Sequence, residues 1–162
     1  MPEPWDAVRK KAGELRPDCW GTPEEVAAMA APVRKAKDRR EATTILKEIA
    51  GNSPFTSKSG LTARLQRRTV GKLVSSVAVY SSFSPEAHYL AAANIDKFFS
   101  NAIEPWLFEL NPNKNNEGIK ARRYLFAPME YQGRIAIIKI TVKEYHAAEN
   151  KLYSIEALDL VQ

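Results

Sequence analysis

Apolar residues alternate with other residues along Arg134–Glu144, and this alternation is the clearest pattern in the chain. Successive side chains of a strand point to opposite faces, so the pattern predicts a strand with two different faces. One face would carry Ala136, Ile138, Ile140 and Val142. The other would carry Ile135, Ile137, Lys139, Thr141 and Lys143. Because the second face changes from apolar to cationic, we expect a half-solvated sheet with a polar working face.

Two further strands are predicted beside this one. Residues at about 121–129 precede a turn at Tyr131–Gly133, and residues at about 152–161 follow a loop that contains His146. Strands that follow one another with short connections usually pair as neighbours. The last forty residues therefore predict a three-stranded antiparallel meander. We expect His146 to be exposed to solvent.

The first fifty residues read as helical. Spaced apolar residues predict a helix over 5–16, and Thr22–Glu25 predicts a helix start with a capping box, in which Thr22 is the N-cap and Pro23 the first helical residue. Pro32 should kink or break this helix, and residues 33–50 should continue as helix. The charges of residues 34–40 are expected to form a solvated helix face.

Two more helical stretches follow a loop at residues 51–62. Residues 61–79 are predicted to be partly helical, and residues 85–103 form the clearest helix, with Ser84 as N-cap. Helices followed by strands predict an α+β fold, with helices packed on a small antiparallel sheet. We place a boundary in the loop, between a helical N-terminal segment (1–50) and an α+β domain (51–162).

Composition adds a basic character to this picture. The 162 residues carry a net charge of +5 and a pI of about 9.3. An anionic partner fits this charge, and nucleic acid fits better than a membrane surface, although many basic proteins bind nothing anionic. The single cysteine, Cys19, excludes an internal disulfide and a Cys/His zinc set. No signal peptide and no apolar run of spanning length are present, so we expect a cytoplasmic protein without a membrane segment.

Cations gather in the middle of the chain. No acidic residue occurs between Ile49 and Pro85. We predict that nucleic acid is bound by the basic residues of this interval together with one arginine of the first strand, namely Lys58, Arg64, Arg67, Arg68, Lys72 and Arg122.

His88 is the candidate acid or base. It lies in the first turn of the predicted 85–103 helix, on the same stripe as Ala91, Ala92 and Ile95, so it should point toward the sheet. Histidine transfers protons near neutral pH, which suits catalysis. A histidine at the edge of the core, satisfied by a hydrogen bond, is an equally good interpretation.

Together with the sheet cations, His88 would suit metal-free cleavage of RNA. That reaction needs a base, an acid and cations that stabilise the phosphorane, while the 2′-hydroxyl is the nucleophile. The acids are scattered, with no paired set in the region of the predicted strands, and no phosphate-binding glycine loop is present, so we expect no cofactor and no metal. The predicted catalytic set is His88, Arg123, Lys139, Thr141, Lys143 and Tyr153.

Several short motifs carry a resemblance. They are Gly60–Ala63, His88 with Asn94-Ile95, Ala121–Pro128, Ile138–Glu144 after a glycine turn, and Lys151–Glu156. Over about residues 50–162 the chain resembles the associated domains of polyvalent proteins of phages and conjugative elements. By extension it is similar to the barnase-, EndoU-, colicin- and RelE-like ribonuclease toxins.

The resemblance implies an α+β ribonuclease-like domain, RNA (tRNA included) as substrate, an immunity or antitoxin partner, and a place in a larger protein. Such a toxin would act in the cytosol of its own cell or of a target cell. The alternative is a non-enzymatic accessory module that binds nucleic acid or protein. The ribonuclease hypothesis expects His88 to lie on the Lys139–Thr141 face of the predicted strand. If His88 packs against the Ile138–Ile140 face instead, that hypothesis loses its base.

Overall fold

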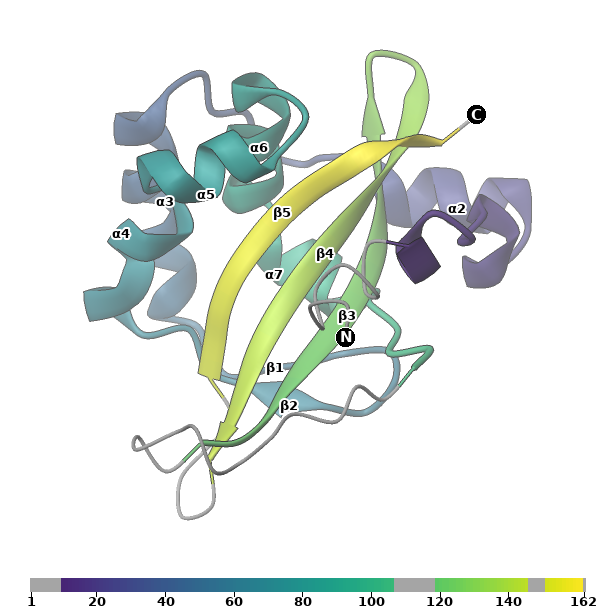
Figure 1. The fold of residues 1–162 in the computed structure, drawn as a ribbon. Coiled ribbons are helices and arrows are strands. Elements are labelled where there is room, and N and C mark those ends of the chain that lie inside the picture. The colour runs from purple at the N-terminus through teal and green to yellow at the C-terminus, as the bar shows by residue number, and fades with distance from the viewer. Residues whose placement is uncertain (1–9, 107–118, 146–150, 162) are drawn as a thin grey trace.

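Three long strands at the C-terminal end form the predicted antiparallel sheet (Figure 1). They are β3 (Ile119–Tyr131), β4 (Arg134–Tyr145) and β5 (Lys151–Val161), in the order β3-β4-β5. This is a computed structural model, and it describes residues 10–106, 119–145 and 151–161. Gln132 and Gly133 join β3 to β4 with φ angles of 51° and 76°. Positive φ at both central residues is what a two-residue type I′ hairpin requires.

Short helices precede the sheet, so the predicted α+β fold is confirmed. Residues 10–12 are helical, while the rest of the predicted first helix up to residue 9 lies outside the described residues. A small hairpin pairs β1 (Phe55–Thr56) with β2 (Thr62–Ala63). The helices are η1 (Pro17–Trp20), α2 (Pro23–Ala30), α3 (Arg39–Ala50), η2 (Arg67–Thr69), α4 (Val70–Leu73), α5 (Ser76–Ser81), α6 (Pro85–Ala93) and α7 (Ile95–Ser100).

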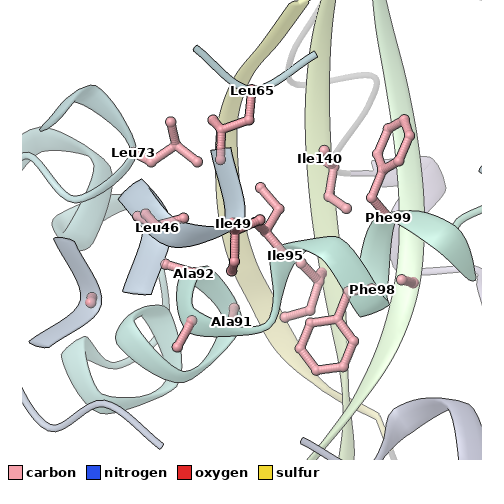
Figure 2. Close-up of a cluster of buried hydrophobic side chains, with 14 of the residues drawn as sticks. Leu46, Ile49, Leu65, Leu73, Ala91, Ala92, Ile95, Phe98, Phe99 and Ile140 are labelled. Carbon is pink, nitrogen blue, oxygen red and sulfur yellow. The ribbon is translucent and has the colours of Figure 1, made fainter. Parts of the chain in front are cut away.

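A helical layer covers one face of the sheet. In the close-up, Leu46 of α3, Leu73 of α4 and Ile95 of α7 gather in one cluster with Ile140 of β4 (Figure 2). This is the strand face that carries Ile138 and Ile140. Burying each large aliphatic side chain contributes about 1.5–3 kcal/mol. Helix α3 precedes the boundary predicted at residue 50, and it packs in this core. The core therefore includes residues from both sides of that boundary. The division of the chain into two units at this point remains a prediction.

The opposite face of the sheet is also covered, which corrects the expectation of a half-solvated sheet. Lys139 and Thr141 are each only 4% exposed. Farther along the same face, Ile137 of β4 packs in a second cluster that includes Trp20 of η1 and Val26 of α2. The Trp20 indole Nε1 also donates to the Phe126 carbonyl of β3, at 3.2 Å. The N-terminal elements therefore shield part of the face that the charge pattern had assigned to solvent.

The predicted helices are shorter than expected. Residues 33–38 are not helical, because Asp38 caps α3 by accepting from the Glu41 backbone N–H at 2.9 Å. The stretch at 61–79 contains β2, η2, α4 and most of α5, and the Ser75 hydroxyl caps α5. The helix predicted over 85–103 is interrupted at Asn94, which separates α6 from α7.

The predicted capping box at the start of α2 is confirmed. Thr22 Oγ1 accepts from the Glu25 backbone N–H at 3.2 Å, and Glu25 Oε1 accepts from the Thr22 backbone N–H at 3.0 Å. The backbone hydrogen bond from Thr22, followed by that residue's side chain, lowers the pKa of the Glu25 carboxyl from its ordinary 4.5. The predicted stop is confirmed as well, since α2 ends at Ala30, two residues before Pro32.

The capping box leads to a titration prediction. NMR titration of the Glu25 carboxyl should give a pKa below 4.5. Thr22→Ala keeps the backbone N–H, which is the larger cause, and removes only the side-chain contribution, so it should move the pKa part of the way back, whereas Thr22→Ser should not. A lowered pKa means that this carboxylate stabilises the fold above its unfolded-state pKa and that the contribution is lost as pH falls through the folded value. An unchanged Glu25 pKa in Thr22→Ala would contradict the prediction.

Candidate functional site

His88 lies inside the helical layer and is fully buried. Its Nε2 is 2.6 Å from the Leu73 carbonyl oxygen, and its Nδ1 is 2.8 Å from the Ser82 hydroxyl. Since a carbonyl only accepts, Nε2 carries the proton, and in the neutral ring Nδ1 accepts from Ser82. Both ring nitrogens are therefore used to hold the end of α4 and the segment before α6.

The structure does not bring His88 to the Lys139 face. His88 belongs to α6, and the neighbouring α6 residue Ala87 packs in the cluster that covers Ile138 and Ile140. Alternation along β4 turns Lys139 to the other side of the sheet. Of the two placements that the sequence left open, His88 takes the side of Ile138 and Ile140.

The predicted catalytic residues of β4 share one face with part of β3. Thr141 is paired directly with Tyr124, and Lys143 with Arg122. The Lys139 ammonium lies 5.5 Å from the centre of the Tyr124 ring, a cation–π distance. This arrangement joins Lys139, Thr141 and Lys143 to Arg122, but Lys139 and Thr141 are almost completely shielded from solvent.

Two other members of the predicted catalytic set lie apart from this group. Arg123 is paired with Val142, on the face that the helical layer covers, and its guanidinium forms an ion pair with Glu104. Tyr153 belongs to β5, where the register shifts between the pairs made by Thr141 and Val142, and its side chain lies outside the described part of the chain. The catalytic role of all six residues stays a prediction.

The residues predicted to bind nucleic acid divide into separate groups. Lys58 lies in the β1–β2 connection, and its ammonium donates to the Trp20 carbonyl at 3.1 Å. Arg64 is half-buried, and Arg122 lies on the sheet. Arg67, Arg68 and Lys72 are all exposed and follow one another along η2 and α4. We call these last three the basic surface.

Helix α3 lies beside the basic surface. The Arg67 guanidinium lies close to Gly51, because a Cβ added to this glycine would be 3.3 Å from Arg67 Nη2. The guanidinium is therefore at the C-terminal end of α3, where the helix dipole favours a cation. At the other end of α3, Arg39 Nη2 donates to the Ser76 hydroxyl of α5 at 3.0 Å.

Arg39 therefore lies close to the same helices, although the sequence did not single it out. It belongs to the charged stretch 34–40, which was assigned to a solvated helix face. Only the hydrogen bond to a residue 37 positions away places it beside α5. The charge density of that stretch was the one available signal.

Two hollows of the described surface contain none of the predicted catalytic residues. One, of about 440 Å³, lies between η1, α2 and Ile135 and is mainly apolar. The other, of about 520 Å³, lies at the start of α3 beside Lys35, Arg40 and Glu41. Among the described residues, no group of three or more His, Cys, Asp or Glu side chains could hold a metal ion, and no helix is long and apolar enough to cross a membrane.

Comparison with protein families gives a match over the same elements. Residues 34–153, about three quarters of the chain, match the model of large polyvalent protein-associated domain 3. The chain belongs to this family. The match starts before the predicted boundary at residue 50 and takes in α3, whose side chains pack in the helical layer. No curated protein and no solved structure matches the chain.

The family match supports one part of the predicted resemblance. An associated domain of large polyvalent proteins agrees with the expected phage or mobile-element origin and with a place in a larger protein. The match does not extend to the ribonuclease toxins.

Proposed function

We propose that this polyvalent protein-associated domain is a non-enzymatic accessory module that binds nucleic acid through the basic surface. The observation that carries the proposal is the exposure of Arg67, Arg68 and Lys72 on two consecutive short helices. The interval from residue 50 to residue 85 contains no acidic residue that could neutralise them locally. A cluster of one sign attracts an anionic polymer and raises its rate of association.

The alternative ribonuclease function has less support from the geometry. Metal-free RNA cleavage needs an acid or base within hydrogen-bonding reach of the reacting oxygens. Among the described side chains, His88 is buried and binds two protein groups, while Lys139 is buried on the other face of the sheet. RNA cleavage and its RNA substrates therefore remain predictions from the sequence and its resemblance, and an immunity partner remains a prediction from the resemblance.

The proposal predicts a salt-dependent affinity for nucleic acid. Each phosphate contact contributes about −0.9 to the slope of log K against log salt for duplex DNA and about −0.7 for single strands. Fluorescence anisotropy of the whole chain with labelled RNA and DNA should therefore show binding that weakens steeply with salt. The double variant Arg67→Ala/Arg68→Ala should bind about tenfold or more weakly, with a slope shallower by about 2.

Lys10→Ala/Arg134→Ala is the matched control, because both residues are exposed and the same charge is removed away from the basic surface. It should keep most of the affinity. Equal losses in the two double variants, or no binding by the unaltered chain at low salt, would overturn the proposal. Gel analysis of the RNA after incubation in EDTA tests for catalysis, since cleavage would favour the ribonuclease hypothesis over the accessory module.

A further inference from the structure

Two apolar side chains of α5 face solvent. Val77 is 78% exposed and Tyr80 is 87% exposed, whereas the large apolar side chains of the neighbouring α4 are buried. Residues three apart in a helix lie on the same side, so Val77 and Tyr80 form one surface feature. Phe83, which follows the helix, is different, because its ring packs edge-to-face on Tyr131 with centroids 5.6 Å apart.

Cations border this feature. Arg39 Nη2 binds the hydroxyl of Ser76, and Ser76 lies one helical turn before Tyr80, on the same side of α5. Lys72 of the basic surface lies shortly before α5, and its carbonyl accepts from the Ser75 hydroxyl at 3.2 Å. Tyr80 is therefore on the side of α5 that Arg39 contacts, and Lys72 lies a few residues before that helix.

The two carboxylates that flank Arg39 in the sequence each accept a hydrogen bond from a backbone N–H. Asp38 accepts from the Glu41 backbone N–H at 2.9 Å, and Glu41 accepts from the Lys37 backbone N–H at 2.8 Å. Helix α5 contains no acidic residue. Arg39 and Lys72 beside a helix that has no acidic residue of its own complement an anion, which favours nucleic acid over a basic protein as the occupant.

We infer that the Tyr80 ring stacks on an unpaired base, so that the nucleic acid bound by the basic surface is single-stranded. The inference rests on the proposed function and specifies its substrate class. An exposed aromatic ring beside cations is how proteins bind single strands without reading their sequence. In a duplex the base faces are already stacked on one another, so Tyr80 would gain nothing from it.

Anisotropy titrations of the whole chain test the inference with Tyr80→Ala, Tyr80→Phe and Val77→Ala. The probes are an unstructured oligothymidine, an oligouridine, a duplex of the same length and an abasic strand. Tyr80→Ala should weaken binding of both single strands about 5- to 150-fold, which is the range that loss of one stacked base gives. Tyr80→Phe and Val77→Ala should bind the single strands nearly as tightly as the unaltered chain does. The abasic strand has no base to stack on Tyr80, so Tyr80→Ala and the unaltered chain should bind it with the same affinity.

The outcomes separate this inference from the proposed function. If Arg67→Ala/Arg68→Ala weakens binding and Tyr80→Ala does not, the basic surface stands and stacking is overturned. Equal losses for duplex and single strand in Tyr80→Ala would also overturn it. If the unaltered chain binds none of the probes, the proposed function fails together with the inference.

Discussion

Asn94→Ala is expected to lower the free energy of unfolding by about 3 kcal/mol. Asn94 is fully buried, and its Oδ1 accepts from the backbone N–H groups of Val33 and Arg34, each at 2.9 Å. Its Nδ2 donates to the carbonyls of Arg34 and Leu90 at 2.9 and 2.8 Å. Alanine would remove these four hydrogen bonds at a partly buried position, and each buried group left unsatisfied costs about 1–3 kcal/mol.

The measurement is urea denaturation followed by circular dichroism. Asn101→Ala is the control, because Asn101 is only half-buried and its Nδ2 donates to the Lys97 carbonyl within its own helix end, at 3.1 Å. Its loss should stay below about 1 kcal/mol. If the two variants unfold at the same urea concentration, Asn94 does not join the segment before α3 to the α6–α7 junction.

The same residue shows why helix ends were hard to predict. The periodicity over 85–103 is local and continues through Asn94, so it indicates a single helix. At this interruption the Asn94 side chain accepts hydrogen bonds from the backbone of Val33 and Arg34, which lie 61 and 60 positions earlier in the chain. Those bonds also hold residues 33 and 34 outside α3. Contacts of such length leave no trace in a short sequence window, whereas the capping box of Thr22 lies within one helical turn and was predicted correctly.

The strands were predictable because their signal is equally local. Alternation with period two identified 134–144, and the glycine turn at Gly133 fixed its pairing with the strand before it. Alternation does not show which elements pack on each face of the sheet. Lys139 and Thr141 are buried, although the charge pattern alone assigns them to the solvent-exposed face.

The candidate site was predictable only in part. An interval without acids pointed to Arg67, Arg68 and Lys72, and their exposure agrees with that signal. Val77 lies in the stretch 61–79 that was predicted to be partly helical, and its apolar character gives no sign that 78% of it is exposed. Composition cannot tell an apolar residue that faces a core from one that faces solvent, so Tyr80 needed the structure.

His88→Ala is the second change with a large expected effect, a loss of about 3 kcal/mol in the free energy of unfolding. The variant would leave a cavity in the helical layer and would remove the partner of the Leu73 carbonyl. Ser82→Ala removes the bond to Nδ1 while the ring stays in place, and it should cost about 1 kcal/mol. Urea denaturation of both variants gives the comparison.

This comparison bears directly on function. A histidine that holds α4 to α6 should lower stability when replaced and leave the affinity of the folded variant for nucleic acid unchanged. A catalytic histidine would show the opposite pattern, with RNA cleavage in the unaltered chain and its loss in a variant of nearly unchanged stability. Because both ring nitrogens bind protein groups in the buried layer, we expect the first pattern. Lys139 would then be a buried residue of the sheet that packs beside Tyr124, and anion binding would belong to the exposed cations of η2 and α4.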